Sequence, residues 1–337
     1  MSTRSQPRSG NSLPASDHRV WHFDVIVSDG FVLTEVAAVV DALRTTNRVL
    51  ATPVFGWTYR SENGGPVQSL SEAFVNTEPF IDKPAADYAF IIGNSDPDCA
   101  ELSLGLVISS YTYRNAQVFL LAEAASRYIK QRGESASKLS THWENSVILR
   151  ERMGLFDADN AIASEDGQIV TCAGMSTTLD VVLAVIRRHI SAAALMTVAN
   201  IFLHEKIRDF STRQPFGGDQ GTTTGDRELD QCIEIMQSNI EDPLPISELV
   251  AALGISNRSL ERKFRTFLGT TPNTYYRELR LAKANNLLLN TTLSVGEVGL
   301  ACGFSNGFSS LYKSFFGITP FVIRKQRRAK CFKPANV

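Results

Sequence analysis

Residues 246–256 read ISELVAALGIS, and residues 295–305 repeat the same pattern as VGEVGLACGFS. In each copy a short helix is expected to end at a glycine, Gly254 or Gly303, which can take the left-handed backbone conformation that a tight turn needs. A second helix is then expected to start at a serine. Helix, glycine turn and helix is the arrangement that places the second helix in a major groove of DNA. The duplication therefore predicts two helix-turn-helix units in an all-α segment.

The second helix of the first unit has two contrasting faces. Leu260, Phe264 and Phe267 recur at helical spacing and are expected to face the core. The exposed stripe of candidate DNA contacts consists of Arg258, Glu261, Arg262 and Arg265. Because arginine can bind guanine through two hydrogen bonds and can also bind phosphate, this stripe predicts both base and backbone contacts.

The second unit offers a different set of side chains. Its expected apolar stripe is Phe308, Leu311, Tyr312 and Phe315. Its exposed candidates for DNA binding are Asn306, Ser309, Ser310 and Lys313. Asparagine can pair with adenine, whereas serine and lysine suit phosphate. A helix over residues 275–289, at ~1.5 Å per residue, would hold the two units about 20 Å or more apart, which suits successive major grooves.

The net charge of −1 hides an uneven distribution of charge along the chain. Residues 245–337 contain 14 Lys and Arg against 4 Asp and Glu, whereas residues 1–244 contain 20 against 31. A basic module on an acidic body is typical of proteins that bind the phosphate backbone. Double-stranded DNA is therefore the expected partner.

Composition indicates a cytoplasmic protein with no metal or other cofactor. The five cysteines are widely spaced and form no C-x-x-C pair, which argues against a disulfide framework and a zinc site. The longest apolar region, residues 190–203, contains polar residues and is shorter than the ~20 residues that span a bilayer. We expect no membrane association, and a bacterial DNA-binding protein of this kind would lie at the nucleoid.

Residues upstream of position 211 alternate between strand and helix patterns. Expected strands lie at 23–27, 55–61, 88–93 and 117–122, and expected helices at 34–50, 104–114, 124–132, 145–153 and 180–207. This alternation predicts a flavodoxin-like α/β fold, a parallel sheet covered by helices. The expected organisation is a disordered tail at 1–19, an α/β domain at 20–210, a flexible linker at 211–227, a DNA-binding domain at 228–330 and a tail at 331–337.

The helical segment resembles the DNA-binding domain of the AraC/XylS family. The residues that carry the resemblance are LERKF at 260–264, ACGF at 301–304 and YKSFFGITP at 312–320. The resemblance implies a transcription factor that binds promoter DNA. One departure is that the chain between Phe304 and Phe308 is shorter than the usual family pattern, which leaves the start of the second recognition helix, and the role of Asn306, open.

The first 210 residues resemble the class I glutamine-amidotransferase-like domains of the ThiJ/PfpI type, which serve as sensors in one branch of AraC regulators. Matching segments are VIVSDGF at 25–31 leading to Glu35, GGPV at 64–67, STHWE at 140–144 and TCAG at 171–174. Enzymes of that fold carry a reactive cysteine at a turn between a strand and a helix, paired with a histidine. Here that position corresponds to Ala122, or in a gapped alternative to Asn115, and neither is a nucleophile.

This resemblance implies a sensor that has lost its catalytic cysteine. Residues 141–144, THWE, also fit a capping box, and Cys172 is interpreted as part of a packing turn. Open parallel sheets bind ligands at the carboxyl ends of their strands. The candidate ligand-binding residues at that edge are Glu35, Ala122, Glu123, His142, Trp143 and Cys172.

The expected function is a non-enzymatic transcriptional regulator that responds to a small, nitrogenous metabolite. Its expected partners are double-stranded DNA, the small-molecule effector, a second copy of the chain and RNA polymerase. An alternative is a ligand-independent regulator whose N-terminal domain only dimerises. A DNA-binding amidase, peptidase or deglycase is a third hypothesis, which the absence of cysteine at both aligned positions disfavours.

Overall fold

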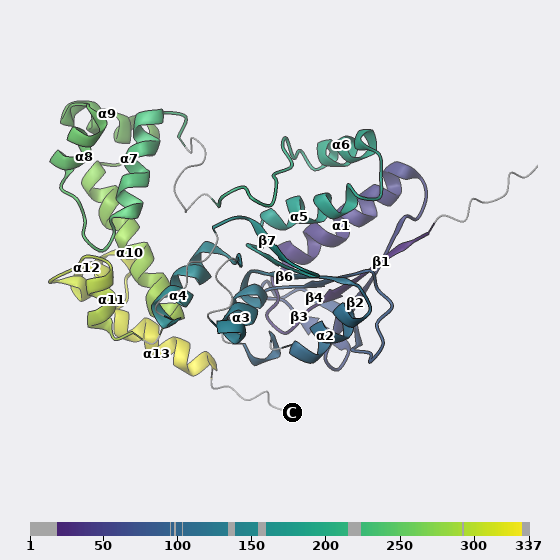
Figure 1. Cartoon of the computed structure of the whole chain (residues 1–337). Coiled ribbons are helices and arrows are strands. Elements are labelled where there is room, and N and C mark those ends of the chain that lie inside the picture. The colour runs from purple at the N-terminus through teal and green to yellow at the C-terminus, as the bar shows by residue number, and fades with distance from the viewer. Residues whose placement is uncertain are drawn as a thin grey trace, which may run out of the picture.

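The computed structural model describes residues 19–94, 96–97, 99–102, 104–133, 139–153, 160–214, 224–291 and 293–331. Figure 1 shows an α/β body followed by an all-helical part. Residues 1–18 and 332–337 of the two predicted tails, and residues 215–223 of the predicted linker at 211–227, fall outside these residues. Cys331, expected in the second tail, is the last residue of a helix.

The α/β body is built on an eight-stranded sheet in the order β3-β4-β2-β1-β5-β6-β8-β7. Strands β1, β2, β4, β5, β6 and β8 run parallel, whereas β3 and β7 pair antiparallel at the two edges. Their bounds are β1 Trp21–Ile26, β2 Phe55–Ser61, β3 Gly65–Gln68, β4 Phe74–Pro79, β5 Tyr88–Ile91, β6 Gln117–Leu121, β7 Ala163–Asp166 and β8 Ile169–Cys172. The predicted α/β class with a mainly parallel sheet is confirmed.

Helices cover both faces of the sheet. Side chains that alternate along β1 separate the two faces, because Phe23 and Val25 enter one core and Ile26 enters the other. The first core lies under α1 (Leu33–Leu50), α5 (Thr177–Ile186) and α6 (Ala192–Ile201). The second lies under α2 (Gly105–Tyr113) and α3 (Ala122–Arg132), and α4 (Trp143–Met153) packs beside α3. A short 3₁₀ helix, η1, spans Ala100–Leu102.

The helix expected over residues 180–207 is wrong, because this segment forms two helices with a turn between them. Ser191 caps the second helix by accepting a hydrogen bond from the backbone amide of Ala194. In the turn, Nε2 of His189 lies 2.7 Å from the hydroxyl of Tyr88 in the sheet, and the centroid of the tilted His189 ring lies 4.0 Å from that of Trp21. These contacts, between residues about 100 to 170 positions apart, fix the turn against the sheet.

The C-terminal part consists of helices throughout its described residues, as expected. They are α7 Arg227–Ser238, α8 Ile246–Leu253, α9 Asn257–Leu268, α10 Pro272–Asn290, α11 Val295–Ala301, α12 Phe308–Phe316 and α13 Pro320–Cys331. Two separate apolar clusters form: one unites α7, α8 and α9, and the other unites α10, α11 and α12. Helix α10 also contributes to the first cluster through Tyr276 and therefore joins the two helix-turn-helix units.

The buried stripes of the two recognition helices differ from the expected ones at their edges. Phe264 is fully buried in α9, but Phe267 is 47% exposed. In α12, Phe308 and Tyr312 are buried, whereas Leu311 and Phe315 are 37% and 48% exposed. The stripes actually follow every fourth residue, so that Leu260, Phe264 and Leu268 in α9, and Phe308, Tyr312 and Phe316 in α12, face the core.

The described helices include none that is both long and apolar enough to cross a membrane. Cys99, Cys172, Cys232 and Cys302 form no disulfide with one another.

Candidate functional site

The exposed face of α9 gathers the polar residues expected to contact DNA. Arg258, Glu261, Arg262 and Arg265 are all exposed, and all line one shallow surface hollow together with Ser256, Ser259 and Thr266. The N-terminus of α9 is capped by Ser256, whose side chain accepts a hydrogen bond from the backbone amide of Ser259. Preceding it, Gly254 ends α8 in the left-handed conformation, with φ of 65°. The first unit thus presents three arginines on one uncovered helix face.

The remaining basic residue of α9, Lys263, has a structural partner instead. Its ammonium group forms ion pairs with Asp226, the N-cap of α7, and with Glu228 at 3.2 Å. The hydrogen bond to Lys263 lowers the pKa of Asp226. Lys263 therefore ties α9 to α7 and lies outside the exposed stripe.

The second recognition helix starts two residues after Asn306. Helix α12 begins at Phe308, preceded by Gly307 in the left-handed conformation with φ of 70°. Asn306 lies in the exposed turn before the helix, whereas Ser309, Ser310 and Lys313 are exposed on it. The second unit thus has a single lysine on its helix where the first has three arginines.

Helix α10 holds the second unit through polar as well as apolar contacts. The guanidinium of Arg280 donates hydrogen bonds to the carbonyls of Cys302 (2.8 Å) and Gly303 (2.6 Å), in the turn after α11. The hydroxyl of Tyr312 in α12 donates to the side-chain oxygen of Asn285. In Figure 1, α9 lies beyond one end of α10 and α12 lies beside its other half. The orientation of both units thus depends on α10.

In the α/β body, Ala122 occupies the turn between β6 and α3. It has a positive φ of 42° and is 2% exposed, at the carboxyl edge of the sheet. The alternative position, Asn115, is exposed in the turn before β6, at the opposite edge. Of the two positions, only Ala122 lies at a turn between a strand and a helix, and its side chain there is a methyl group.

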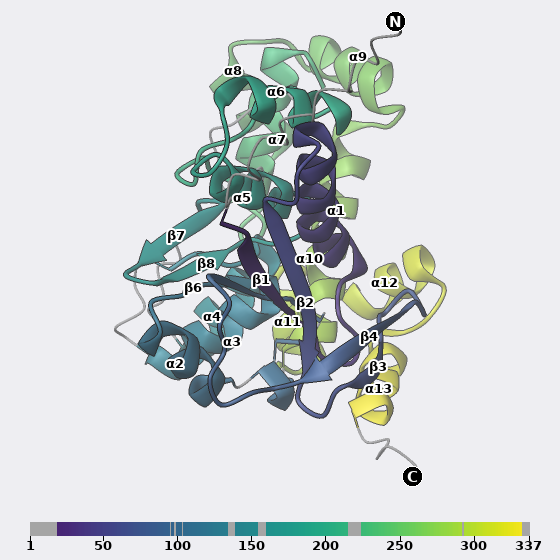
Figure 2. The same cartoon turned by 90° about the vertical axis from the view of Figure 1, so that its right-hand side faces the viewer.

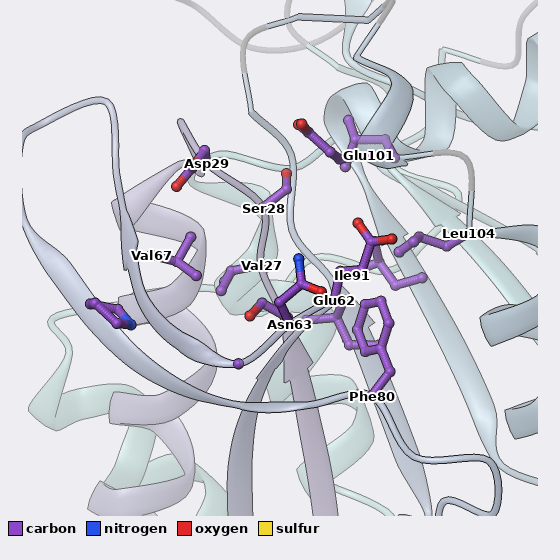
Figure 3. Close-up of a pocket in the computed structure, with 15 residues that line it drawn as sticks. Val27, Ser28, Asp29, Glu62, Asn63, Val67, Phe80, Ile91, Glu101 and Leu104 are labelled. Atoms are coloured by element: carbon purple, nitrogen blue, oxygen red, sulfur yellow. The ribbon is translucent and has the colours of Figure 1, made fainter. Parts of the chain in front are cut away.

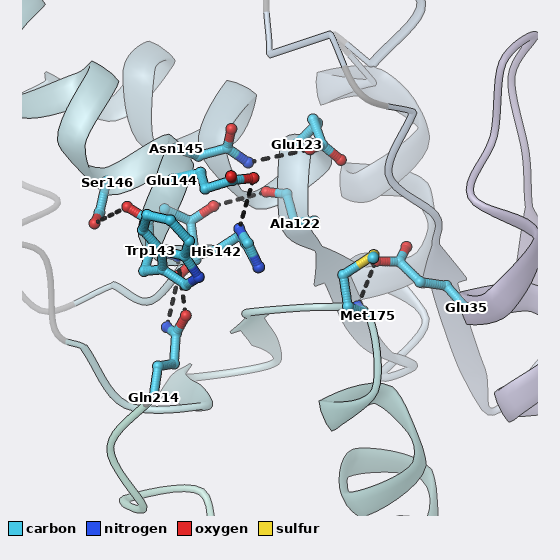
Figure 4. Close-up of polar contacts among 11 residues, drawn as sticks. Glu35, Ala122, Glu123, His142, Trp143, Glu144, Asn145, Ser146, Met175 and Gln214 are labelled. Carbon is cyan, nitrogen blue, oxygen red and sulfur yellow. Dashed lines mark hydrogen bonds and ion pairs between the residues drawn. The ribbon is translucent and has the colours of Figure 1, made fainter. Parts of the chain in front are cut away.

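Glu35, in the first turn of α1, is completely buried beneath this turn (Figure 4). Its Oε1 accepts a hydrogen bond from the backbone amide of Met175 (2.8 Å), and its Oε2 accepts one from that of Gly93 (2.9 Å). Burial raises the pKa of Glu35 to about 8, against these two hydrogen bonds. At neutral pH the group is therefore mainly a neutral carboxylic acid.

Glu123 lies next to Ala122 and faces the same region. Its Oε1 accepts a hydrogen bond from the side-chain amide of Asn145 in α4 at 3.3 Å. Its Oε2 is buried and has no hydrogen-bond partner among the described residues. A Cβ atom at Gly93 would lie 2.3 Å from this oxygen, so that a larger residue there would displace the Glu123 carboxyl group. The site thus contains the fully buried carboxyl group of Glu35 and the partly buried one of Glu123.

His142 and Trp143 lie at the start of α4, on the other side of Ala122. Helix α4 begins at Trp143, so that His142 and not Thr141 stands at its N-cap, and the capping box predicted for residues 141–144 is wrong. The hydroxyl of Thr141 donates instead to the carbonyl of Ala122 (2.7 Å). Burial lowers the pKa of His142, although the charge of Glu123 opposes this effect. His142 Nδ1 is 3.6 Å from a carboxyl oxygen of Glu144, and its ring centroid is 5.6 Å from that of Trp143.

Cys172 ends β8 and is paired in register with Leu121, the residue before Ala122. It is fully buried, and burial raises its thiol pKa well above the usual range, as does the nearby Glu35. A protonated, buried thiol is a poor nucleophile.

The structure adds residues to this region that sequence reasoning missed. Gly93, Thr141, Asn145 and Met175 all contact the predicted set through the hydrogen bonds described above. Gly93, two residues after the buried strand β5, was an available signal, because a glycine there permits close approach of another group. Met175 gave none, since its contact with Glu35 joins residues 140 positions apart.

The first turn of α4 also contacts the DNA-binding helices. Helices α4 and α10 pack against one another, as Figure 1 shows. The side chain of Asn286 in α10 is a hydrogen-bond partner of Glu144 in α4. Burial raises the pKa of Glu144, and this hydrogen bond partly offsets the rise. Backbone N–H of Trp143 donates to the side-chain oxygen of Gln214 (2.9 Å), close to the end of the α/β body.

Comparisons with known proteins agree with this architecture. A helix-turn-helix domain model matches residues 249–326. The HTH-type transcriptional regulator ArgR of Pseudomonas aeruginosa is 31% identical over 241 residues, which cover 71% of this chain and 73% of ArgR. The regulator GbdR of the same species is 26% identical over 325 residues, covering 91% of this chain and 85% of GbdR. A solved AraC-type regulator structure from Chromobacterium violaceum is 47% identical, covers 30% of this chain and 91% of that one, and has a TM-score of 0.29.

These matches define the class as helix-turn-helix transcriptional regulators. The chain belongs to the AraC family, with an α/β domain in front of the DNA-binding domain.

Proposed function

We propose that this regulator recognises a specific promoter sequence mainly through α9. The observation that carries the proposal is the exposed stripe of Arg258, Arg262 and Arg265 on the second helix of a helix-turn-helix unit. Arginine at such a position can grip O6 and N7 of guanine, and Glu261 can accept a hydrogen bond from N4 of cytosine. The first unit therefore supplies most of the base discrimination.

The second unit, in this proposal, serves mainly as an anchor. Asn306 precedes α12, and Ser309, Ser310 and Lys313 are short or singly charged side chains that suit phosphate oxygens. Phosphate contacts fix the position of a protein on DNA without reading sequence. Asn306 remains the side chain best able to reach a base in this unit.

The α/β domain acts, we infer, as a sensor without catalytic activity. Ala122 stands where a nucleophile would be needed, and the thiol of Cys172 is buried with a raised pKa. The proposed ligand-binding set is Glu35, Ala122, Glu123, His142, Trp143 and Cys172, and the ligand is a small nitrogenous metabolite. His142 and Glu123 would hold such a ligand directly, whereas Glu35, which is fully buried and hydrogen-bonded to the backbone amides of Met175 and Gly93, would shape the site from within.

Helix α4 offers a physical route from this region to the DNA-binding domain. Thr141 and Asn145 hold Ala122 and Glu123, while Glu144, between them, meets Asn286 of α10. A ligand that moved the start of α4 would displace its contact with α10, on which both reading helices depend. Such coupling requires the ligand to bind one arrangement of the domains more tightly than the other.

The regulator would act in the cytoplasm at promoter DNA, as a dimer and with RNA polymerase as its partner. Footprinting of the full chain on its promoter, with and without nitrogenous metabolites, tests the sensor half. We expect at least one metabolite to change the DNA affinity. Unchanged affinity for every metabolite would instead favour the alternative, in which the α/β domain only dimerises.

A further inference from the structure

The turn of the second helix-turn-helix unit packs directly against the first unit. Gly303 follows α11 with φ of 71°, and a Cβ atom there would lie 2.7 Å from Cδ of Pro243 and 2.8 Å from the carbonyl oxygen of Glu241. Both neighbours belong to the α7–α8 loop, residues 239–245. Gly254, the equivalent glycine of the first unit, has φ of 65°, and a Cβ atom there would meet open space in the described part of the chain. The close approach at Gly303 is therefore not needed for the turn itself, and it joins the two units.

The α7–α8 loop also enters the apolar core of the second unit. Ile240 is 3% exposed and belongs to the cluster of α10, α11 and α12, which includes Leu281 and Val298. Leu279 of α10 packs against the clusters of both units. Rotation of one unit against the other would expose Ile240 to water, which is unfavourable for an apolar side chain. We therefore expect the two units to move as one body.

Two side chains of α10 hold the two sides of this contact. The hydroxyl of Tyr276 donates a hydrogen bond to the carbonyl of Asn239, at the start of the α7–α8 loop (2.5 Å). Arg280 donates to the carbonyls of Cys302 and Gly303, in the turn of the second unit. Residues four positions apart lie on the same face of a helix. One face of α10 thus binds the loop of the first unit and the turn of the second.

Arg280 is also linked to the start of the second recognition helix. Its guanidinium carbon lies 4.1 Å from the ring centroid of Phe304, an attractive arrangement of a cation over an aromatic face. The rings of Phe304 and Phe308 stack with their centroids 5.4 Å apart, and Phe308 is the first residue of α12. A single side chain therefore contacts both the turn before α12 and the aromatic residue on which α12 begins.

We propose that Arg280 is a positioning residue that sets the separation between the two DNA contacts. It holds the turn of the second unit against the loop of the first, and so fixes where α12 meets DNA relative to α9. The chain then requires one separation between the two blocks of its DNA site. This role rests on the proposed function, because it needs α9 and α12 to bind the same DNA together.

Binding of the full chain to duplexes with altered spacing tests this role. The duplexes carry the site that wild type selects from random DNA, with no base pair or one base pair inserted between its two blocks. The insertion moves the second block by about 3.4 Å and about a tenth of a turn. Fluorescence anisotropy should show at least tenfold weaker binding of wild type to the lengthened site. In Arg280→Met the same insertion should weaken binding less than threefold.

The ratio of the two affinities separates positioning from a structural role. A variant that only loses stability binds both duplexes more weakly by the same factor, so its ratio stays that of wild type. Arg277→Met replaces an exposed arginine of the same helix and should keep the wild-type ratio. Tyr276→Phe removes only the hydroxyl group that binds Asn239, keeps the buried ring, and should lower the ratio at least twofold. This milder variant serves if Arg280→Met does not fold.

All three variants lie in the DNA-binding helices. The α/β body has its own cavity of about 200 Å³ beyond the ends of β1 and β2, and only residues of that body line it (Figure 3). None of the substitutions alters this cavity or the residues around Ala122. A changed ratio therefore reports on the DNA-binding domain.

Two outcomes would overturn the positioning role. One is a wild-type chain that accepts the inserted base pair with less than tenfold loss of affinity. The other is a wild-type ratio in Arg280→Met or, if that variant does not fold, in Tyr276→Phe. Recognition of two blocks in these cases leaves the proposed DNA recognition intact. Selection of a single block, or of none, would contradict the proposed function and this role with it.

Discussion

Oε1 of Glu35 accepts a hydrogen bond from the backbone amide of Met175 at 2.8 Å, across 140 residues of sequence. This bond joins the first turn of α1 to the turn after β8, directly beneath Ala122. A Cβ atom at Gly174 would lie 2.2 Å from the same oxygen, which explains why glycine precedes Met175. The carboxyl group is therefore enclosed by backbone, and its protonation is coupled to folding.

Glu35 should make the stability of the α/β domain depend on pH. Its folded-state pKa of about 8 lies above its ordinary value of 4.5, so the folded state retains a proton that the unfolded state releases. The free energy of unfolding is therefore highest below about pH 4.5. As the pH rises from there to about 8, it should fall by on the order of 5 kcal/mol. Urea unfolding from pH 5 to 8.5 measures this loss. In Glu35→Gln the free energy of unfolding should depend less on pH than in the control Glu205→Gln, which changes an exposed residue. The same pH dependence in both variants would contradict the raised pKa of Glu35.

The backbone at Ala122 should tolerate glycine but resist a β-branched residue. With φ of 42° and almost no exposure, Ala122→Val would combine left-handed strain with overpacking and should lower the free energy of unfolding by more than about 2 kcal/mol. Ala122→Gly should stay within about 1 kcal/mol of wild type. Ala125→Val, in a fully buried position of α3, controls for overpacking alone. Equal losses in the two valine variants would show that the turn carries no strain.

Arg262 should contribute to recognition of a specific DNA sequence. Arg262→Ala is expected to weaken binding to the preferred site by about 1–3 kcal/mol and to relax the preference at one base pair. Arg44→Ala, an exposed residue of α1 in the α/β body, makes the same change in charge and should leave affinity nearly unchanged. Fluorescence anisotropy on matched and mismatched DNA measures both effects, and wild-type affinity in Arg262→Ala would rule out this contact.

Lys313 should act on every DNA sequence alike. If it binds phosphate, Lys313→Ala lowers affinity for specific and non-specific DNA by a similar factor. It should also reduce the slope of log affinity against log salt concentration by about one unit. Selective loss of affinity for the specific site alone would instead assign Lys313 to base recognition.

Sequence periodicity predicted the helix-turn-helix units because their contacts are local. The turn glycines, the N-cap Ser256 and the buried residues at four-residue spacing all lie within a few positions of one another. The same reasoning placed Phe267 and Phe315 in the core, although each lies one position to the side of the buried stripe. Which edge residues the neighbouring helices cover depends on helix packing, and periodicity carries no information about it.

The region around Ala122 was only partly predictable because its contacts join distant segments. Resemblance placed Glu35, Ala122 and His142 in one site, but it could not supply the roles of Gly93 or Met175. Thr141 was predicted to cap a helix, whereas its hydroxyl binds the carbonyl of Ala122, 19 residues earlier. Side chains that suit a local motif can serve a distant partner equally well.

Selection of binding sites from random DNA by the full chain tests the central claim most directly. Two reading helices joined by α10 predict an enriched site with two blocks about 10–10.5 base pairs apart, the stronger block contacted by α9. Arg262→Ala should lose the preference in that block, and Lys313→Ala should keep both. Enrichment of no sequence, or of a block whose preference survives Arg262→Ala, would contradict the account.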